Sequence, residues 1–262
     1  MRLVSFRRAR RATPSGEPRW LIDRRVAAAL FVVLTLSLPL HFVQRLGDAL
    51  GEPTLRTWLL AADAGLKTLV WAAFAVFIYR RSPSRTPARS ARAFVACAAA
   101  IVPGIFLAAP DPDGAIWAFV AGEALVVVAV AFTLASVLSL GTCFGVLPEV
   151  RGLVTRGPYG FVRHPVYVGE IVAFTGFVVA SQRPLNALPL VVFCLGQAAR
   201  LRLEEAALLA EFPDEYGSYA RRTPRLVPRP AAVVAALRDR TPAIQTSPSG
   251  HLAAADASPS GG

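Results

Sequence analysis

The sequence predicts an all-α membrane protein that crosses the bilayer several times. Its 262 residues are 54% hydrophobic and only 17% charged, and the mean hydropathy is +0.48. Soluble domains average about a quarter charged residues, so this composition excludes an ordinary soluble fold. The formal net charge is +11, but the arginines lie between long apolar runs, which indicates membrane orientation rather than a nucleic-acid surface.

Residues 1–25 are rich in arginine and precede an apolar stretch that is too long for the h-region of a cleavable signal. We expect a basic cytoplasmic N-terminal segment followed by an anchor that is retained. A bilayer core requires about 20 apolar residues per helix, so residues 26–140 are expected to hold four spanning helices. These correspond to four apolar runs, Val26–Val43, Trp58–Tyr79, Phe94–Ala109 and Ile116–Leu140.

Two shorter apolar runs, Val166–Ala180 and Leu185–Ala199, are separated by the polar turn Ser181-Gln182-Arg183-Pro184 and are expected to form a helical hairpin. The connection after the second span is crowded with arginines, whereas the connection after the third carries only Asp111 and Asp113. By the positive-inside rule, both termini and the region that follows the fourth span are cytoplasmic. We expect a multi-pass protein of a bacterial-type plasma membrane.

The last part of the chain, residues 230–262, is dominated by Ala, Pro, Ser and Gly. Such a composition cannot bury enough apolar area to offset chain entropy, so a disordered tail is expected. The three cysteines are far apart and partly inside apolar runs, and they indicate neither a disulfide framework nor a metal site. They are Cys97, Cys143 and Cys194.

Three ionisable residues fall inside the predicted spans. Asp63 and Lys67 are four residues apart and share a helix face, and Glu123 is expected at a similar depth on the fourth span. Charges in hydrocarbon are costly unless they are paired. Two alternatives follow, a structural cluster that fixes helix contacts, or a substrate or ion pathway.

The richest polar stretch is RGPYGFVRHPVYVGE, residues 156–170. Its Gly-Pro and His-Pro steps interrupt regular structure and leave backbone groups free to bind a small ligand. The alternative is an interfacial belt, in which tyrosines and arginines anchor the helix at the lipid headgroups.

A second polar cluster follows the hairpin. Arg200 and Glu204 have the spacing of a surface ion pair, on a helix expected to continue into water, and Glu205 is adjacent. Further along, EFPDEYGSYARRTPRLVP covers residues 211–228. The hairpin returns this cluster to the membrane surface that carries residues 156–167.

These two clusters together resemble a known family. The run GPYGFVRHPVYVGE, the hairpin, the glutamate pair and the closing tyrosines resemble the integral membrane methyltransferases that include isoprenylcysteine carboxyl methyltransferases and phospholipid N-methyltransferases. The resemblance covers about Leu138–Pro228, and we expect residues 141–229 to form a methyltransferase-like catalytic region with a cytoplasmic cofactor pocket.

The resemblance implies an S-adenosylmethionine site without a Rossmann domain. Carried over residue by residue, the cofactor-binding set is Gly157, Pro158, Tyr159, Arg163, His164, Tyr167, Gly169, Glu204 and Glu205. The implied catalytic residues are Arg200, Glu205 and His164. Arg200 would orient an anionic acceptor, and His164 would hydrogen-bond the donor or accept a proton from an amine.

Methyl transfer from a sulfonium needs no enzyme nucleophile and no metal, because positioning and water exclusion supply the rate. The acceptor implied by the resemblance is lipophilic, either a carboxylate like that of isoprenylcysteine or a membrane lipid. Two alternatives stay open: a reductase of the related sterol-reductase branch, which binds a nicotinamide cofactor, and a non-catalytic or transport protein.

Overall fold

The computed structural model describes residues 32, 36–80, 90–108, 110–111, 113–145 and 149–228. The expected N-terminal segment, much of the first predicted span and the expected tail lie outside these residues. The elements within them are helical. They are α2 (Ser37–Gly51), α3 (Leu55–Arg80), α4 (Ala91–Ile101), η1 (Val102–Phe106), α5 (Ile116–Leu140), η2 (Gly141–Cys143), α6 (Pro158–Phe161), α7 (Pro165–Ser181), η3 (Pro184–Asn186), α8 (Ala187–Glu211) and α9 (Pro213–Arg222).

Within the described part of the chain, three helical segments are long and apolar enough to cross a bilayer: Leu55–Arg80, Ile116–Cys143 and Pro184–Glu211. The third predicted run is shorter as a helix than expected. Helix α4 has 11 residues and gives way to a 3-10 turn that contains Pro103, because proline lacks the N–H that would continue the α-helical ladder. These long apolar helices therefore agree with the expectation of a polytopic all-α membrane protein.

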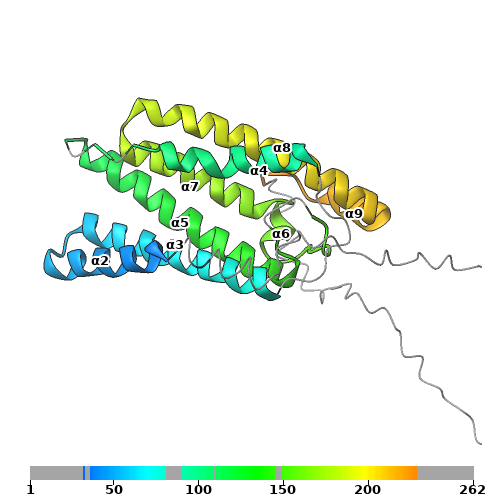
Figure 1. Cartoon of the computed structure of the whole chain (residues 1–262), viewed down its shortest axis with the longest axis horizontal. Coiled ribbons are helices and arrows are strands. Elements are labelled where there is room, and N and C mark those ends of the chain that lie inside the picture. The colour runs from blue at the N-terminus through cyan, green and yellow to red at the C-terminus, as the bar shows by residue number, and fades with distance from the viewer. Residues whose placement is uncertain are drawn as a thin grey trace, which may run out of the picture.

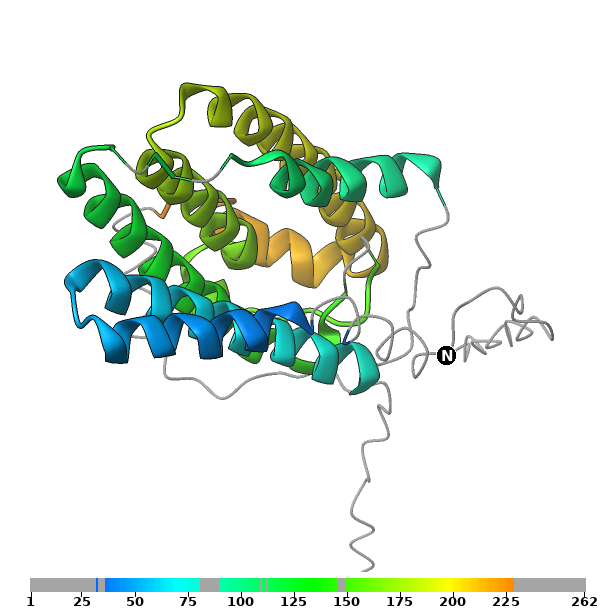
Figure 2. The same ribbon diagram turned by 60° about the vertical axis from the view of Figure 1, so that its left-hand side comes forward.

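The two arms of the predicted hairpin pack against different neighbours (Figures 1 and 2). Helix α7 packs chiefly along α5, which in turn packs on α3, and α8 packs chiefly along α4. Figure 2 shows α4 and α8 on one side of the molecule and α2, α3 and α5 on the other. This divergence of α7 and α8 leaves room between them for the cavity described below.

The turn between α7 and α8 is tied to the connection that precedes α5 by two side-chain amides. Gln182 accepts a hydrogen bond from the backbone N–H of Ala115 at 2.8 Å and donates to its carbonyl at 3.0 Å. Asn186 makes the same pair of bonds with Ala108, at 2.9 and 3.0 Å. These bonds hold the far end of the bundle together and satisfy backbone groups where the helices end.

Candidate active site

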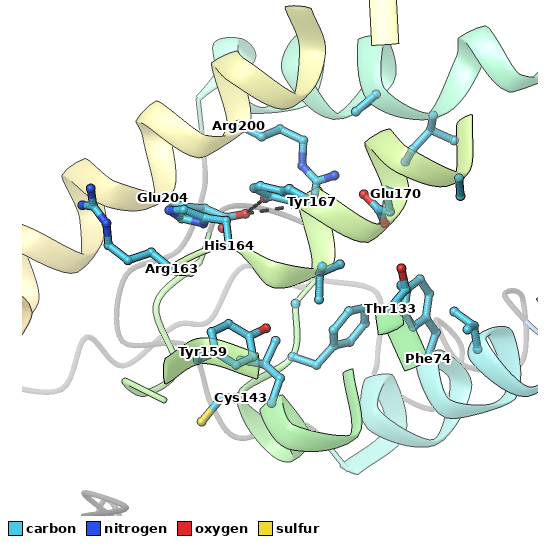
Figure 3. Close-up of a pocket in the computed structure, with 18 of the residues that line it drawn as sticks. Phe74, Thr133, Cys143, Tyr159, Arg163, His164, Tyr167, Glu170, Arg200 and Glu204 are labelled. Carbon is cyan, nitrogen blue, oxygen red and sulfur yellow. Dashed lines mark hydrogen bonds and ion pairs between the residues drawn. The ribbon is translucent and has the colours of Figure 1, made fainter. Parts of the chain in front are cut away.

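A cavity of about 700 Å³ lies between the diverging helices α7 and α8. Residues from α3, α4, α5, α9 and the connection after α5 complete its walls. Ligand pockets in proteins commonly have volumes of about 300–1,000 Å³. Figure 3 shows polar side chains from α7 (Tyr167 and Glu170), from α8 (Arg200 and Glu204) and from the residues just before α7 (Arg163 and His164).

Tyr167 and Glu204 join the two helices across the cavity. The Tyr167 hydroxyl donates a hydrogen bond to Glu204 Oε1, and the His164 ring stacks on the Tyr167 ring with centroids 5.5 Å apart. Figure 3 shows these three side chains close together. The histidine and tyrosine of the RHPxY motif thus lie beside the first glutamate of α8.

Arg200 is buried, with only 8% of its surface exposed, so the prediction that it forms a surface pair on a solvated helix is wrong. Its guanidinium carbon lies 4.8 Å from the centroid of the Tyr167 ring, and its Nη2 is 4.0 Å from Glu204 Oε1. The reason is tertiary, because α8 continues along α4 and turns this face toward α7.

The structure adds two residues to those selected from the sequence, Glu170 and Gln197. Gln197 donates from Nε2 to Glu170 Oε2 and accepts at Oε1 from Arg200 Nη1 at 3.2 Å. Both residues lie one helical turn from a selected residue, Glu170 from Tyr167 and Gln197 from Arg200. This i, i+3 spacing is the signal in the sequence that would have found them.

Glu205 is not among the described residues that line the cavity, and it connects three basic groups. Its Oε1 lies 2.8 Å from Arg163 Nη1 and 3.2 Å from His164 Nε2, and its Oε2 lies 2.8 Å from Arg225 Nη2. The backbone supports this cluster, because the N–H groups of Arg163 and His164 donate to the carbonyls of Pro224 and Arg225. Adjacent glutamates therefore have different surroundings, the cavity for Glu204 and this cluster for Glu205.

The Gly157-Pro158-Tyr159 segment forms the turn into α6. Gly157 has φ +57°, a conformation that a residue with a Cβ adopts only at a cost. Tyr159 is buried and lines the cavity, and its carbonyl accepts a 2.6 Å hydrogen bond from the Tyr219 hydroxyl of α9. Burial, reinforced by the nearby Glu204 charge, raises the pKa of Tyr159 well above its ordinary range, so this phenol stays neutral.

Gly169 does not line the cavity among the described residues. It lies where α7 meets α5, and a Cβ there would meet the Thr133 hydroxyl and come within 3.0 Å of the Ala129 carbonyl. Its position indicates close helix packing. Cys143, in contrast, lies on the cavity wall and forms no disulfide bond.

Of the three ionisable residues predicted inside the spans, Asp63 and Lys67 form an ion pair, and Glu123 stands apart from it. Lys67 Nζ lies 2.6 Å from Asp63 Oδ2, and Lys67 also lines the inner part of the cavity. Glu123 is 3% exposed, and its Oε2 has no hydrogen-bond partner. In the described part of the chain, no group of three or more His, Cys, Asp or Glu residues could hold a metal ion.

The cavity combines features that suit a charged organic ligand. Glu204 offers a carboxylate, and Arg163 has a buried Nε–H with no hydrogen-bond partner. The aromatic rings of Tyr159 and Tyr167 face the same space. A ligand with an ammonium, a carboxylate and a further cationic centre matches this set of groups.

Comparison with known proteins shows what this region is similar to. Residues 117–215 match the family model described as phospholipid methyltransferase. The chain is 38% identical over 78 residues to the cobalt-zinc-cadmium resistance protein CzcN of Cupriavidus metallidurans, which covers 29% of this chain and 36% of that protein.

Two enzymes are also similar. Methanethiol S-methyltransferase 2 of Bradyrhizobium diazoefficiens is 37% identical over 87 residues, 31% of each chain. Protein-S-isoprenylcysteine O-methyltransferase B of Arabidopsis thaliana is 33% identical over 99 residues, 36% of this chain and 50% of that enzyme. The chain thus spans about a third to a half of the length of these relatives. The resemblance indicated by the sequence motif is confirmed: over residues 117–215 the chain matches the phospholipid methyltransferase family.

Proposed function

We propose that this protein is an S-adenosylmethionine-dependent methyltransferase that acts on a lipophilic acceptor from the membrane. The observation that carries the proposal is the convergence of Tyr167, Arg200 and Glu204 on one cavity. The match of residues 117–215 to a methyltransferase family supports it, as do the two similar methyltransferases.

The groups around the cavity fit the donor. Glu204 binds the ammonium group of S-adenosylmethionine, and the unpartnered Nε–H of Arg163 binds its carboxylate. Tyr159 and Tyr167 present aromatic rings that favour a cationic sulfonium. When bound, the donor supplies an electrophilic methyl group.

The apolar part of the cavity suits the acceptor. Trp71 and Phe74 of α3 line it, and Phe174 of α7 stacks on Phe193 of α8 with ring centroids 4.6 Å apart. These walls bind an apolar tail and exclude water, so that the two reactants are held in line. Two of the helices that supply them, α3 and α8, are long and apolar enough to cross a bilayer, so a lipophilic acceptor would reach the site from the membrane.

A ligand titration on the detergent-solubilised protein tests the proposal. We expect micromolar binding of S-adenosylmethionine and no binding of a reduced nicotinamide cofactor. Glu204→Gln should weaken donor binding, while Glu52→Gln, which changes an exposed carboxylate in the turn between α2 and α3, should not. Absence of donor binding by the wild type refutes the proposal, and nicotinamide binding in its place would indicate a reductase.

A further inference from the structure

Glu170 is a carboxylate of the cavity that the donor site leaves unused. Gln197 donates a hydrogen bond to its Oε2, and the same amide accepts one from Arg200 Nη1 at 3.2 Å. Because an amide donates only from nitrogen and accepts only at oxygen, these two bonds fix the orientation of Gln197. Gln197, which is 2% exposed, is therefore a positioning residue that holds Glu170 as a hydrogen-bond acceptor.

The other charged side chains of the cavity wall are largely neutralised by ion pairs. Lys67 pairs with Asp63 at 2.6 Å, Glu149 pairs with Arg151, and Arg163 pairs with Glu205 at 2.8 Å. When these pairs and His164 are left out of the count, the charged residues among the described lining residues are Arg200, Glu170 and Glu204.

These three residues leave an excess of one negative charge. S-adenosylmethionine carries one net positive charge, because its sulfonium and ammonium outweigh its carboxylate. The charges of the donor and of these three residues are therefore balanced without any charge from the acceptor. An anionic acceptor would add an uncompensated charge beside Glu170 in a site where charges are weakly screened.

We propose that the acceptor is electrically neutral and carries a proton on its nucleophilic atom, as a thiol or an uncharged amine does, and that Glu170 accepts this proton. The inference rests on the proposed function, and of the two acceptors that the family resemblance implies, a carboxylate or a membrane lipid, it excludes the carboxylate. The acceptor sulfur or nitrogen forms a bond to the methyl carbon, and the bond between that carbon and the donor sulfur breaks. The broken bond's electron pair stays on the donor sulfur, and the acceptor proton passes to the Glu170 carboxylate.

Glu170 is better placed for this role than His164. The Nε2 atom of His164 lies 3.2 Å from Glu205 Oε1, and Glu205 also binds Arg163 and Arg225. The histidine nitrogen is therefore occupied by a carboxylate. Glu170 lines the same cavity as the aromatic residues that would hold the acceptor tail.

Three probes with the same tail separate the possible acceptors: octanethiol, octylamine and octanoate. With labelled donor and purified full-length protein, we expect methyl transfer to the thiol or the amine and none to octanoate. Calorimetry in the presence of sinefungin, a cationic donor analogue that transfers no methyl group, gives a readout independent of turnover. Octanethiol, which is uncharged near neutral pH, should bind at least about tenfold more tightly than octanoate, a ratio that corresponds to about 1.4 kcal/mol.

The Glu170→Gln variant tests the base directly. A general base typically contributes about 10²–10⁴-fold, so we expect a rate loss in this range with donor binding retained. The loss should shrink for thiols of lower pKa and as the pH rises through the thiol pKa, because the thiolate needs no base. A purely structural role would lower transfer to all thiols equally. Glu170→Asp keeps a carboxylate and should keep the wild-type pH profile at a lower rate, and Glu52→Gln serves as the control.

The outcomes separate this inference from the proposed function. Failure of the wild type to bind the donor overturns both. Donor binding with transfer to octanoate alone, or with no transfer to the thiol and amine, overturns only the inference. An equal Glu170→Gln loss for thiols of high and low pKa also overturns it.

Discussion

The adjacent residues Glu204 and Glu205 should respond differently to the same substitution. Glu204 lines the cavity and is proposed to bind the donor ammonium. Glu205 binds Arg163, His164 and Arg225 instead. We expect Glu204→Gln to act mainly on donor binding, because glutamine keeps an acceptor for the Tyr167 hydroxyl, and Glu205→Gln to destabilise the fold.

The magnitudes follow from these contacts. A hydrogen bond to a charged group contributes about 1.5–3 kcal/mol, which for Glu204 corresponds to an increase in the donor Kd of about 10- to 140-fold. Breaking a buried ion pair by removing one partner costs about 3–5 kcal/mol. Since glutamine keeps a neutral acceptor, we expect a loss of about 3 kcal/mol for Glu205→Gln, at the lower end of that range.

Arg225 provides a matched control. Its side chain is 61% exposed, compared with 12% for Arg163, and exposed ion pairs contribute about 0–1 kcal/mol. Arg225→Gln should therefore destabilise the protein much less than Glu205→Gln. Arg163→Gln combined with Glu205→Gln should cost less than the sum of the two single changes, because they remove the same pair.

Two measurements on each detergent-solubilised variant check this prediction. Equilibrium unfolding by titration with sodium dodecyl sulfate gives the stability, and calorimetric titration with S-adenosylmethionine gives the donor Kd of the folded protein. The reasoning is refuted if both glutamate variants lose donor affinity equally at unchanged stability. It is also refuted if Glu205→Gln is as stable as Arg225→Gln.

Three further predictions concern the surrounding structure. Gly169→Val should lower stability by about 1–3 kcal/mol through overpacking against α5 while the folded fraction keeps its donor affinity, as measured by unfolding and calorimetry; a loss of affinity alone would contradict the packing role. Tyr219→Phe should lower the free energy of unfolding by about 1–3 kcal/mol, because it leaves the buried Tyr159 carbonyl without its donor. Burial raises the pKa of Tyr219, so this loss should be constant between about pH 6 and 9 and decline only above the unfolded-state pKa of about 10. A loss that changes between about pH 6 and 9 would count against this reasoning. Lys67→Met should destabilise the protein, because it leaves the Asp63 charge buried and unpaired. Adding Asp63→Asn removes that charge and should restore part of the stability measured by detergent unfolding. A further loss of stability in the double variant would show that the pair is not coupled.

Much of the fold could be predicted from local sequence patterns. Long apolar runs can only be helices in lipid, where each backbone polar group needs a partner within its own segment. The runs Trp58–Tyr79 and Ile116–Leu140 accordingly coincide closely with α3 and α5. The Gly-Pro and His-Pro steps also mark the turns before α6 and α7, because proline fixes φ and removes a donor. The residues that match the family model, 117–215, include this same linear motif.

The sequence by itself determined that this chain is helical, apolar enough for a membrane, and equipped with two polar clusters near one another. Only the tertiary structure decided which side chains face the cavity. Neighbours on a helix with 3.6 residues per turn point about 100° apart, so Glu204 and Glu205 take different roles according to how α8 is rotated against α4. The same rotation buries Arg200 and brings Gln197 to Glu170, because packing between distant segments, and no local pattern, sets that angle.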